Sequence, residues 1–336
     1  MCIVVIAVLL FGLRGVPSAD EQLRAIDVAH AIADEENAAL VYGRIILDET
    51  LPSLAPRDLP ADVQEATFAR PWRSEEFPQA TAWINQRKGV VEILLQAGRK
   101  QGCWFPAAEA SKQSTRRWSL VMEGKNLLLR AANNDMGENR VEEGLEKLLC
   151  VFQMAEHFRS QFHPSDYDAS MIVTSEALQR LAELAIRGDM PPDWLIRFES
   201  VLPPLEETWY EQSKLLYKAE KLYMESIGRN SLTQILHVFD RTRRREMERN
   251  YFLLLAKSRA VRVLLELRRH KNETGSWPED LEEIASHVAP EALIDPETGE
   301  PFKYRRTNDT FTLYSIGANR RDEGGNAGDD HRFWPR

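Results

Sequence analysis

The chain has 336 residues, enough for about two domains of the usual ~150 residues each. Hydrophobic residues make up 43% and charged residues 28%, a balance that is typical of a soluble globular protein and excludes a disordered chain. The net charge of −9 disfavours a general nucleic-acid binder, and a mean hydropathy of −0.42 excludes a polytopic membrane protein.

Residues 1–13 form an unbroken apolar run, MCIVVIAVLLFGL, which ends at Arg14. A membrane-spanning helix needs about 20 apolar residues and a signal-peptide core roughly 7–15, so the length favours a secretory signal. Small residues at 16–19 offer a cleavage site, although no Lys or Arg precedes the run. The alternatives are a longer anchor that has been clipped and a buried N-terminal element of a cytosolic protein. We expect residues 1–19 to be a signal peptide or truncated membrane anchor, and the protein to be exported, periplasmic or anchored to the inner membrane.

The next 230 residues carry mostly helical patterns and no repeat of fixed period. Residues 51–78 contain five prolines and no sustained period, which predicts an extended connection over the surface. Apolar residues recur at helical spacing in four other stretches: 21–48, 79–99, 107–189, where two or three helices are expected, and 205–270. We therefore predict an all-helical domain over residues 20–249.

The C-terminal residues change character after Gly275, which is placed to end a helix. Pro278 suits the first position of a new short helix, and residues 295–299 read as a turn. The segments 302–305 and 311–314 are predicted to be strands of a short antiparallel hairpin. The expected fold is therefore mainly α, with a small α+β module over residues 250–336.

This module carries two motifs in order, DPxTGxPFxY at 295–304 and FxLYSxGxN at 311–319, and the second is followed by Gly-Gly and Asp-Asp pairs. Together with the preceding helix and the segment GSWP at 275–278, they resemble the C-terminal globular part of the major pseudopilin of bacterial type II secretion systems. The resemblance covers about a quarter of the chain, over residues 251–334.

The resemblance implies a calcium-binding loop after the last of these strands. Calcium takes six to eight oxygen ligands on a flexible loop, and the residues at matching positions are Asn319, Asp322, Asp329 and Asp330. Three arginines and a histidine depart from the family pattern here: Arg320, Arg321, Arg332 and His331. The alternative is a solvated polar tail in which Asp and Gly form turns.

Assembly as a filament subunit is not expected. Residues 1–20 lack the prepilin-peptidase signature of a cleavage Gly, an aromatic residue and a Glu, and some 200 residues separate the N-terminus from the module. The chain is instead similar to uncharacterised bacterial proteins in which such a module follows a helical region, and that similarity implies no activity.

Other chemistry-bearing residues give weak signals. Cys103 and Cys150 have no metal-ligand spacing; they could pair in an exported chain or be small buried side chains. No zinc-type His spacing, phosphate-binding loop or GxSxG motif occurs, so neither Ser175 nor Ser315 has the context of a nucleophile. Four residues could be drawn as a site but more often cap a helix end: His157, His163, Asp166 and Asp168.

Two functional hypotheses follow. The first is a non-enzymatic interaction or structural protein of the cell envelope with protein partners there, no nucleic acid, and membrane contact through residues 1–19 if these are uncleaved. The second is a hydrolase-type enzyme with a site between helices of residues 20–249. A cleft with two carboxylates, or with a His–carboxylate pair of perturbed pKa, would favour the enzyme.

Overall fold

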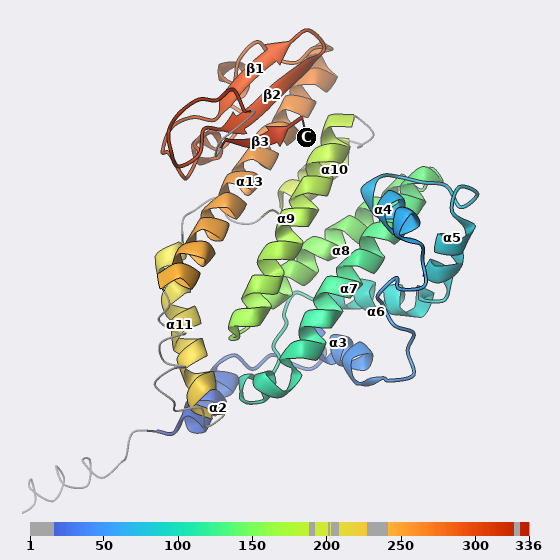
Figure 1. Ribbon diagram of the computed structural model, residues 1–336, viewed down its shortest axis with the longest axis vertical. Coiled ribbons are helices and arrows are strands. Elements are labelled where there is room, and N and C mark those ends of the chain that lie inside the picture. The colour runs from blue at the N-terminus through green and yellow to red at the C-terminus, as the bar shows by residue number, and fades with distance from the viewer. Residues whose placement is uncertain are drawn as a thin grey trace, which may run out of the picture.

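The computed structural model describes residues 17–187, 192–200, 202, 208–226, 241–325 and 330–335. These residues are mainly helical, with one three-stranded antiparallel sheet near the C-terminus, which confirms the predicted fold class. The sheet lies at one end of the long axis and α2 (Ala19–Ala29) at the other (Figure 1). No helix in this part of the chain is long and apolar enough to span a membrane. Residues 1–16 of the predicted signal or anchor lie outside it.

The first helices are short and begin at recognisable caps. Ser18 and Glu21 form a capping box at the start of α2, each side chain bonding to the backbone of the other residue. Asn37 caps the next helix by accepting a hydrogen bond from the backbone of Ala39. Residues 21–48 are therefore two helices rather than one continuous pattern. The elements that follow α2 are α3 (Ala38–Leu47), α4 (Ala61–Ala69), α5 (Pro78–Asn85), α6 (Lys88–Gly98) and the 3₁₀ turn η1 (Ala107–Glu109).

The extended connection predicted over residues 51–78 is wrong in its centre, where α4 forms. Val63 and Thr67 of α4 are buried against α7 (Ala110–Gly137). Asn133 of α7 donates hydrogen bonds to the carbonyls of Thr67 and Phe68, which have no partner within their own helix. Tertiary contact with α7 therefore stabilises a helix that its own sequence pattern does not indicate.

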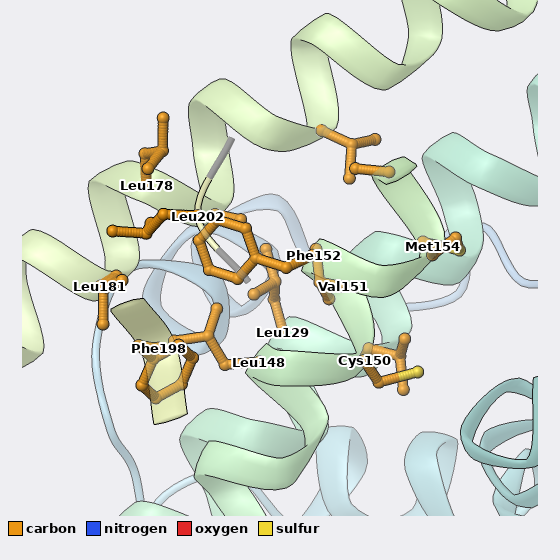
Figure 2. Close-up of a cluster of buried hydrophobic side chains, with 14 of the residues drawn as sticks. Leu129, Leu148, Cys150, Val151, Phe152, Met154, Leu178, Leu181, Phe198 and Leu202 are labelled. Atoms are coloured by element: carbon orange, nitrogen blue, oxygen red, sulfur yellow. The ribbon is translucent and has the colours of Figure 1, made fainter. Parts of the chain in front are cut away.

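The centre of the structure is a set of long helices packed side by side. Residues 107–189 give three of them, where two or three were predicted, and α8 packs against both α7 and α9. Figure 2 shows apolar side chains of α8 and α9 gathered with those of α10, among them Phe152, Leu178 and Phe198. The bounds are α8 (Val141–Arg159), α9 (Pro164–Arg187), α10 (Pro192–Glu199), α11 (Trp209–Ser226) and α13 (Arg241–Thr274).

The sheet has the order β1-β2-β3, with β1 (Lys303–Thr307), β2 (Thr310–Ser315) and β3 (His331–Trp334). The predicted hairpin is confirmed, with Thr307 paired to Thr310 and Asn308 in the left-handed conformation at φ 46°. β3 pairs antiparallel with β2 and lies in residues for which the sequence indicated a calcium-binding loop or a polar tail, but no strand. The 3₁₀ turns η2 (Glu282–Ile284) and η3 (Pro290–Leu293) precede the sheet.

Helix α13 joins the two predicted domains. It packs along α9 on the helical side and contacts η2, η3 and β3 on the other. The predicted boundary between residues 249 and 250 lies inside this helix. One cluster of buried apolar residues extends without interruption from Ala38 in α3 to Phe333 in β3. Among the described residues, the helices α3 to α10, helix α13 and the sheet therefore share one core, whereas α2 and α11 bury their apolar side chains in two smaller clusters.

Candidate functional site

The loop between β2 and β3 holds the calcium ligands that the resemblance implies. Asp322 Oδ1 accepts hydrogen bonds from the Tyr314 hydroxyl and the Gly324 backbone, each at 2.9 Å. These two bonds hold the pKa of Asp322 below its ordinary value, so its carboxylate is ionised at neutral pH. Asp330 Oδ2 accepts from the backbone of Glu323 at 3.1 Å and of Gly325 at 2.8 Å. Asp329 lies outside the described residues.

A further carboxylate, Glu323, belongs to the same loop, although it is not among the ligands that the resemblance implies. Its Oε1 accepts a hydrogen bond from the side-chain amide of Asn319 at 3.3 Å. The other oxygen, Glu323 Oε2, and Asp330 Oδ1 are both buried without a hydrogen-bond partner among the described residues, which omit 326–329 of this loop. A buried carboxylate oxygen without a partner costs free energy, and a bound cation would remove that cost. The two buried oxygens without partners are therefore the feature of this loop that fits the implied calcium ion.

Other features of the loop limit that fit. Among the described residues, no three His, Cys, Asp or Glu side chains gather closely enough to hold a metal ion. A calcium ion here would take carbonyl or water oxygens for much of its shell. Arg332 brings positive charge into the loop by donating to the Gly325 carbonyl at 2.8 Å, whereas Arg320 turns away to the Thr298 carbonyl at 3.3 Å.

The turn of the first motif is held to β2 by Asp295, whose side chain is almost fully buried. Its Oδ2 accepts from Ser315 Oγ at 2.6 Å and from Thr298 Oγ1 at 3.1 Å, and its Oδ1 accepts from the Glu297 backbone at 3.0 Å. Ser315 is therefore a structural donor. Asp295 and Thr298 of the first motif and Ser315 of the second motif therefore form one polar contact between the two motifs.

The helical part contains a buried ion pair that the sequence did not reveal. Arg117 Nη2 on α7 lies 2.8 Å from Asp166 Oδ2 on α9, and both side chains are at most 2% exposed. Burial raises the pKa of Asp166 to about 7, and the guanidinium of Arg117 opposes that rise. Since these residues are 49 positions apart in sequence, no local pattern could have linked them.

The four residues noted around positions 157–168 do not form one site. The His157 ring bonds to the Tyr42 hydroxyl at 3.1 Å and to the Lys100 carbonyl at 2.9 Å, which ties α8 to α3 and the end of α6. His163 lies just before α9 and its Nδ1 is 2.6 Å from Ser165 Oγ. Burial lowers the pKa of His163 to about 4, with Arg117 adding to the effect. His163 does lie at a helix end, where its carbonyl accepts from the Asp166 backbone, but its side chain bonds to the Ser165 hydroxyl.

Both cysteines of the described chain are buried free thiols. Cys150 Sγ contacts the Leu94 carbonyl at 3.3 Å, and burial raises the pKa of this thiol to about 12. Burial also raises the pKa of the Cys103 thiol well above its ordinary value. The sequence left open whether the two cysteines pair or are small buried side chains. In the structure both are small side chains of the core.

Comparison with family models, curated proteins and solved structures finds no match for this chain. The pseudopilin resemblance therefore stays a prediction from the sequence motifs, and any functional conclusion depends on the geometry of the chain itself.

The Arg117–Asp166 pair gives a test of the buried charges. Arg117→Met leaves a buried carboxyl without its partner and is expected to lower the free energy of unfolding by about 3–5 kcal/mol at pH 8. The loss should be smaller at pH 5, because an acid whose pKa is raised in the folded state gains a proton there and stops being a buried charge. Urea denaturation at both pH values measures this.

Arg117→Met combined with Asp166→Leu is the control, since it removes both charges and should recover most of the lost stability. A double variant as unstable as the sum of the two single changes would show that the pair is not the coupled unit described here.

Proposed function

We propose that this chain is a non-enzymatic interaction protein of the cell envelope, exported or anchored to the inner membrane through residues 1–19. Its helical part, residues 20–249, binds a partner protein, and residues 250–336 are a pseudopilin-like module that holds calcium. The observation that carries the interaction role is an open apolar groove along α3. This α3 groove is lined on one side by Leu40, Gly43 and Leu47 and on the other by Ile32 and residues 104–106.

The α3 groove combines a large volume with an exposed apolar face of α3. Its volume is about 990 Å³. Leu40 and Leu47 are seven residues apart, so they share one face of α3, and they are 52% and 66% exposed. Gly43 lies between them, and the space around it is open. Large apolar side chains this exposed on one helix face are typical of a surface that a partner covers.

The charge along the α3 groove indicates the chemistry of that partner. Among the residues whose side chains are described, its lining contains one cation, Arg44, against three aspartates: Asp27, Asp34 and Asp48. Asp27 also fixes the opposite wall, since Oδ1 accepts hydrogen bonds from Trp104 Nε1 and from the Ala107 backbone. An amphipathic helix that presents an apolar stripe flanked by Lys or Arg matches this surface. The proposed partner is thus an envelope protein that carries such a basic helix.

A pair of synthetic helices tests the groove. A fluorescent amphipathic peptide of Leu and Lys should bind the full chain saturably, and the same design with Glu in place of Lys should bind at least about tenfold more weakly, a difference of about 1.4 kcal/mol. The double variant Leu40→Glu with Leu47→Glu should weaken the Lys peptide by a similar factor in fluorescence anisotropy.

Ile196→Glu is the matched control, because Ile196 is 63% exposed on α10 and does not line the groove. Equal binding of the two peptides, or full binding to the Leu40/Leu47 variant, would contradict the proposed interface.

The calcium part of the proposal has its own test. In 1 mM calcium the full chain should unfold several degrees higher than in excess chelator, since a ligand at a hundredfold excess over Kd adds about 2.7 kcal/mol to the stability of the folded state. Asp330→Asn should abolish that difference, whereas Glu291→Gln, an exposed change outside the loop, should leave it intact. A midpoint that does not depend on calcium, or a shift that survives Asp330→Asn, would remove the metal from the proposal.

A hydrolase is the second candidate, and one contact favours it. Lys257 Nζ on α13 lies 2.6 Å from Ser175 Oγ on α9, beside a cavity of about 520 Å³. A serine beside a lysine can act as a nucleophile when the lysine is neutral. Three acidic residues line the same cavity and favour a protonated lysine, which donates to the hydroxyl instead of accepting its proton: Asp168, Glu176 and Glu246. The interaction role is therefore the better supported of the two.

A further inference from the structure

A second cavity lies where α2 and α11 meet the turn between α8 and α9. Its volume is about 320 Å³, the lower end of the range for small-molecule sites. The interior is formed by apolar and aromatic side chains from four separate segments: Ile26, Trp104, Phe162, Leu215, Leu216 and Ala219. Trp104 also borders the α3 groove, but the two hollows are otherwise lined by different residues.

Most polar groups in the wall of this cavity already have partners. Tyr167 donates to Gln212 Oε1 at 2.6 Å, and Gln161 bonds to the backbone of Phe105 and of Cys103. His163 is different, because its Nδ1 is engaged with Ser165 while its Nε2 makes no hydrogen bond to any described residue. The ring is neutral at physiological pH, since burial depresses its pKa to about 4. As a neutral ring, His163 adds no charge to the cavity wall.

The charges at this cavity are opposite to those of the protein as a whole. The chain has a net charge of −9, yet no acidic residue lines the cavity in the part of the chain that is described. Two cationic side chains do so, Arg159 at the end of α8 and Lys218 on α11. Arg159 pairs with Glu156 at 2.7 Å, whereas exposed Lys218 forms no ion pair with a described residue. The unbalanced charge at the cavity is thus positive.

We propose that this cavity binds a single-chain amphiphilic carboxylate, with its hydrocarbon chain among the apolar side chains and its carboxylate against Lys218 and Arg159. Apolar burial provides the affinity and is proportional to the chain area removed from water. The cationic side chains select an anionic head group over a neutral or cationic one. The volume suits one medium-length chain, so a two-chain lipid does not fit. This site is independent of the α3 groove and of the calcium loop.

Decanoate is the probe, and titration calorimetry on the full chain is the measurement. Decanoate should bind saturably, and decylamine, which has the same chain and the opposite charge, should bind at least about tenfold more weakly. Ala219→Trp should abolish decanoate binding by filling the cavity. Lys218→Glu should weaken it about tenfold or more without affecting the fold, because the side chain is exposed.

Lys221→Glu is the matched control, since Lys221 lies on the same helix but does not line the cavity. It should bind decanoate as the unaltered chain does. The proposal is overturned if decanoate does not bind, if decylamine binds equally well, or if Lys218→Glu and Lys221→Glu have the same effect. Because Lys218→Glu is a surface change, the test stands even if Ala219→Trp fails to fold.

Discussion

The burial of α13 between α9 and the sheet is the contact on which the rest of the structure depends. Nearly half of the residues in this helix are charged, but a stripe of small and branched residues along it is almost fully buried: Ala256, Ala260, Val263, Leu264 and Leu267. Each fully buried Val or Leu side chain contributes about 1.5–3 kcal/mol relative to an exposed one. This stripe alone is therefore comparable with the net stability of a typical domain, about 5–15 kcal/mol.

Buried arginines fix α13 to both neighbours. Arg268 Nε donates to the Ala185 carbonyl at the end of α9 at 2.6 Å, and its guanidinium lies over the Trp277 ring. Arg259 Nη1 donates to the Ile294 carbonyl beside η3 at 2.9 Å. Each arginine supplies hydrogen bonds to carbonyls at the end of an element, which would otherwise be buried without partners. These contacts join α9, α13 and the segment before the sheet, and α3 and the sheet lie toward opposite ends of the structure (Figure 1).

Much of the fold could be predicted, because α7 to α9 have clear helical spacing and because Asn308 and its neighbours read as a hairpin turn. What sequence reasoning missed depends on contacts between distant residues. α4 forms where Asn133 and Arg180 bind its last carbonyls, and β3 forms because β2 offers an unpaired edge. The break between α2 and α3 is fixed by Asn37, whose side chain bonds to both the backbone N–H and the carbonyl of Trp104.

The candidate sites were less predictable than the fold. Asp322 and Asp330 could be selected because the motif FxLYSxGxN marks the loop, whereas Glu323 could not, since its burial depends on how the loop closes. The α3 groove depends on the exposure of Leu40 and Leu47, which the sequence shows only as ordinary apolar positions of a helix. The second cavity takes its walls from four segments, and no local pattern could indicate that they meet.

Native-state hydrogen exchange across a denaturant series tests most directly whether the helices and the sheet share one core. Slowly exchanging amides of β2, such as that of Leu313, should open with the same free energy and the same denaturant dependence as those of Leu178 in α9 and Leu264 in α13. That result would show one cooperative unit. Exchange of the β2 amides through a cheaper opening that leaves α9 and α13 protected would contradict it, and the sheet would then be a separate domain attached to the end of α13.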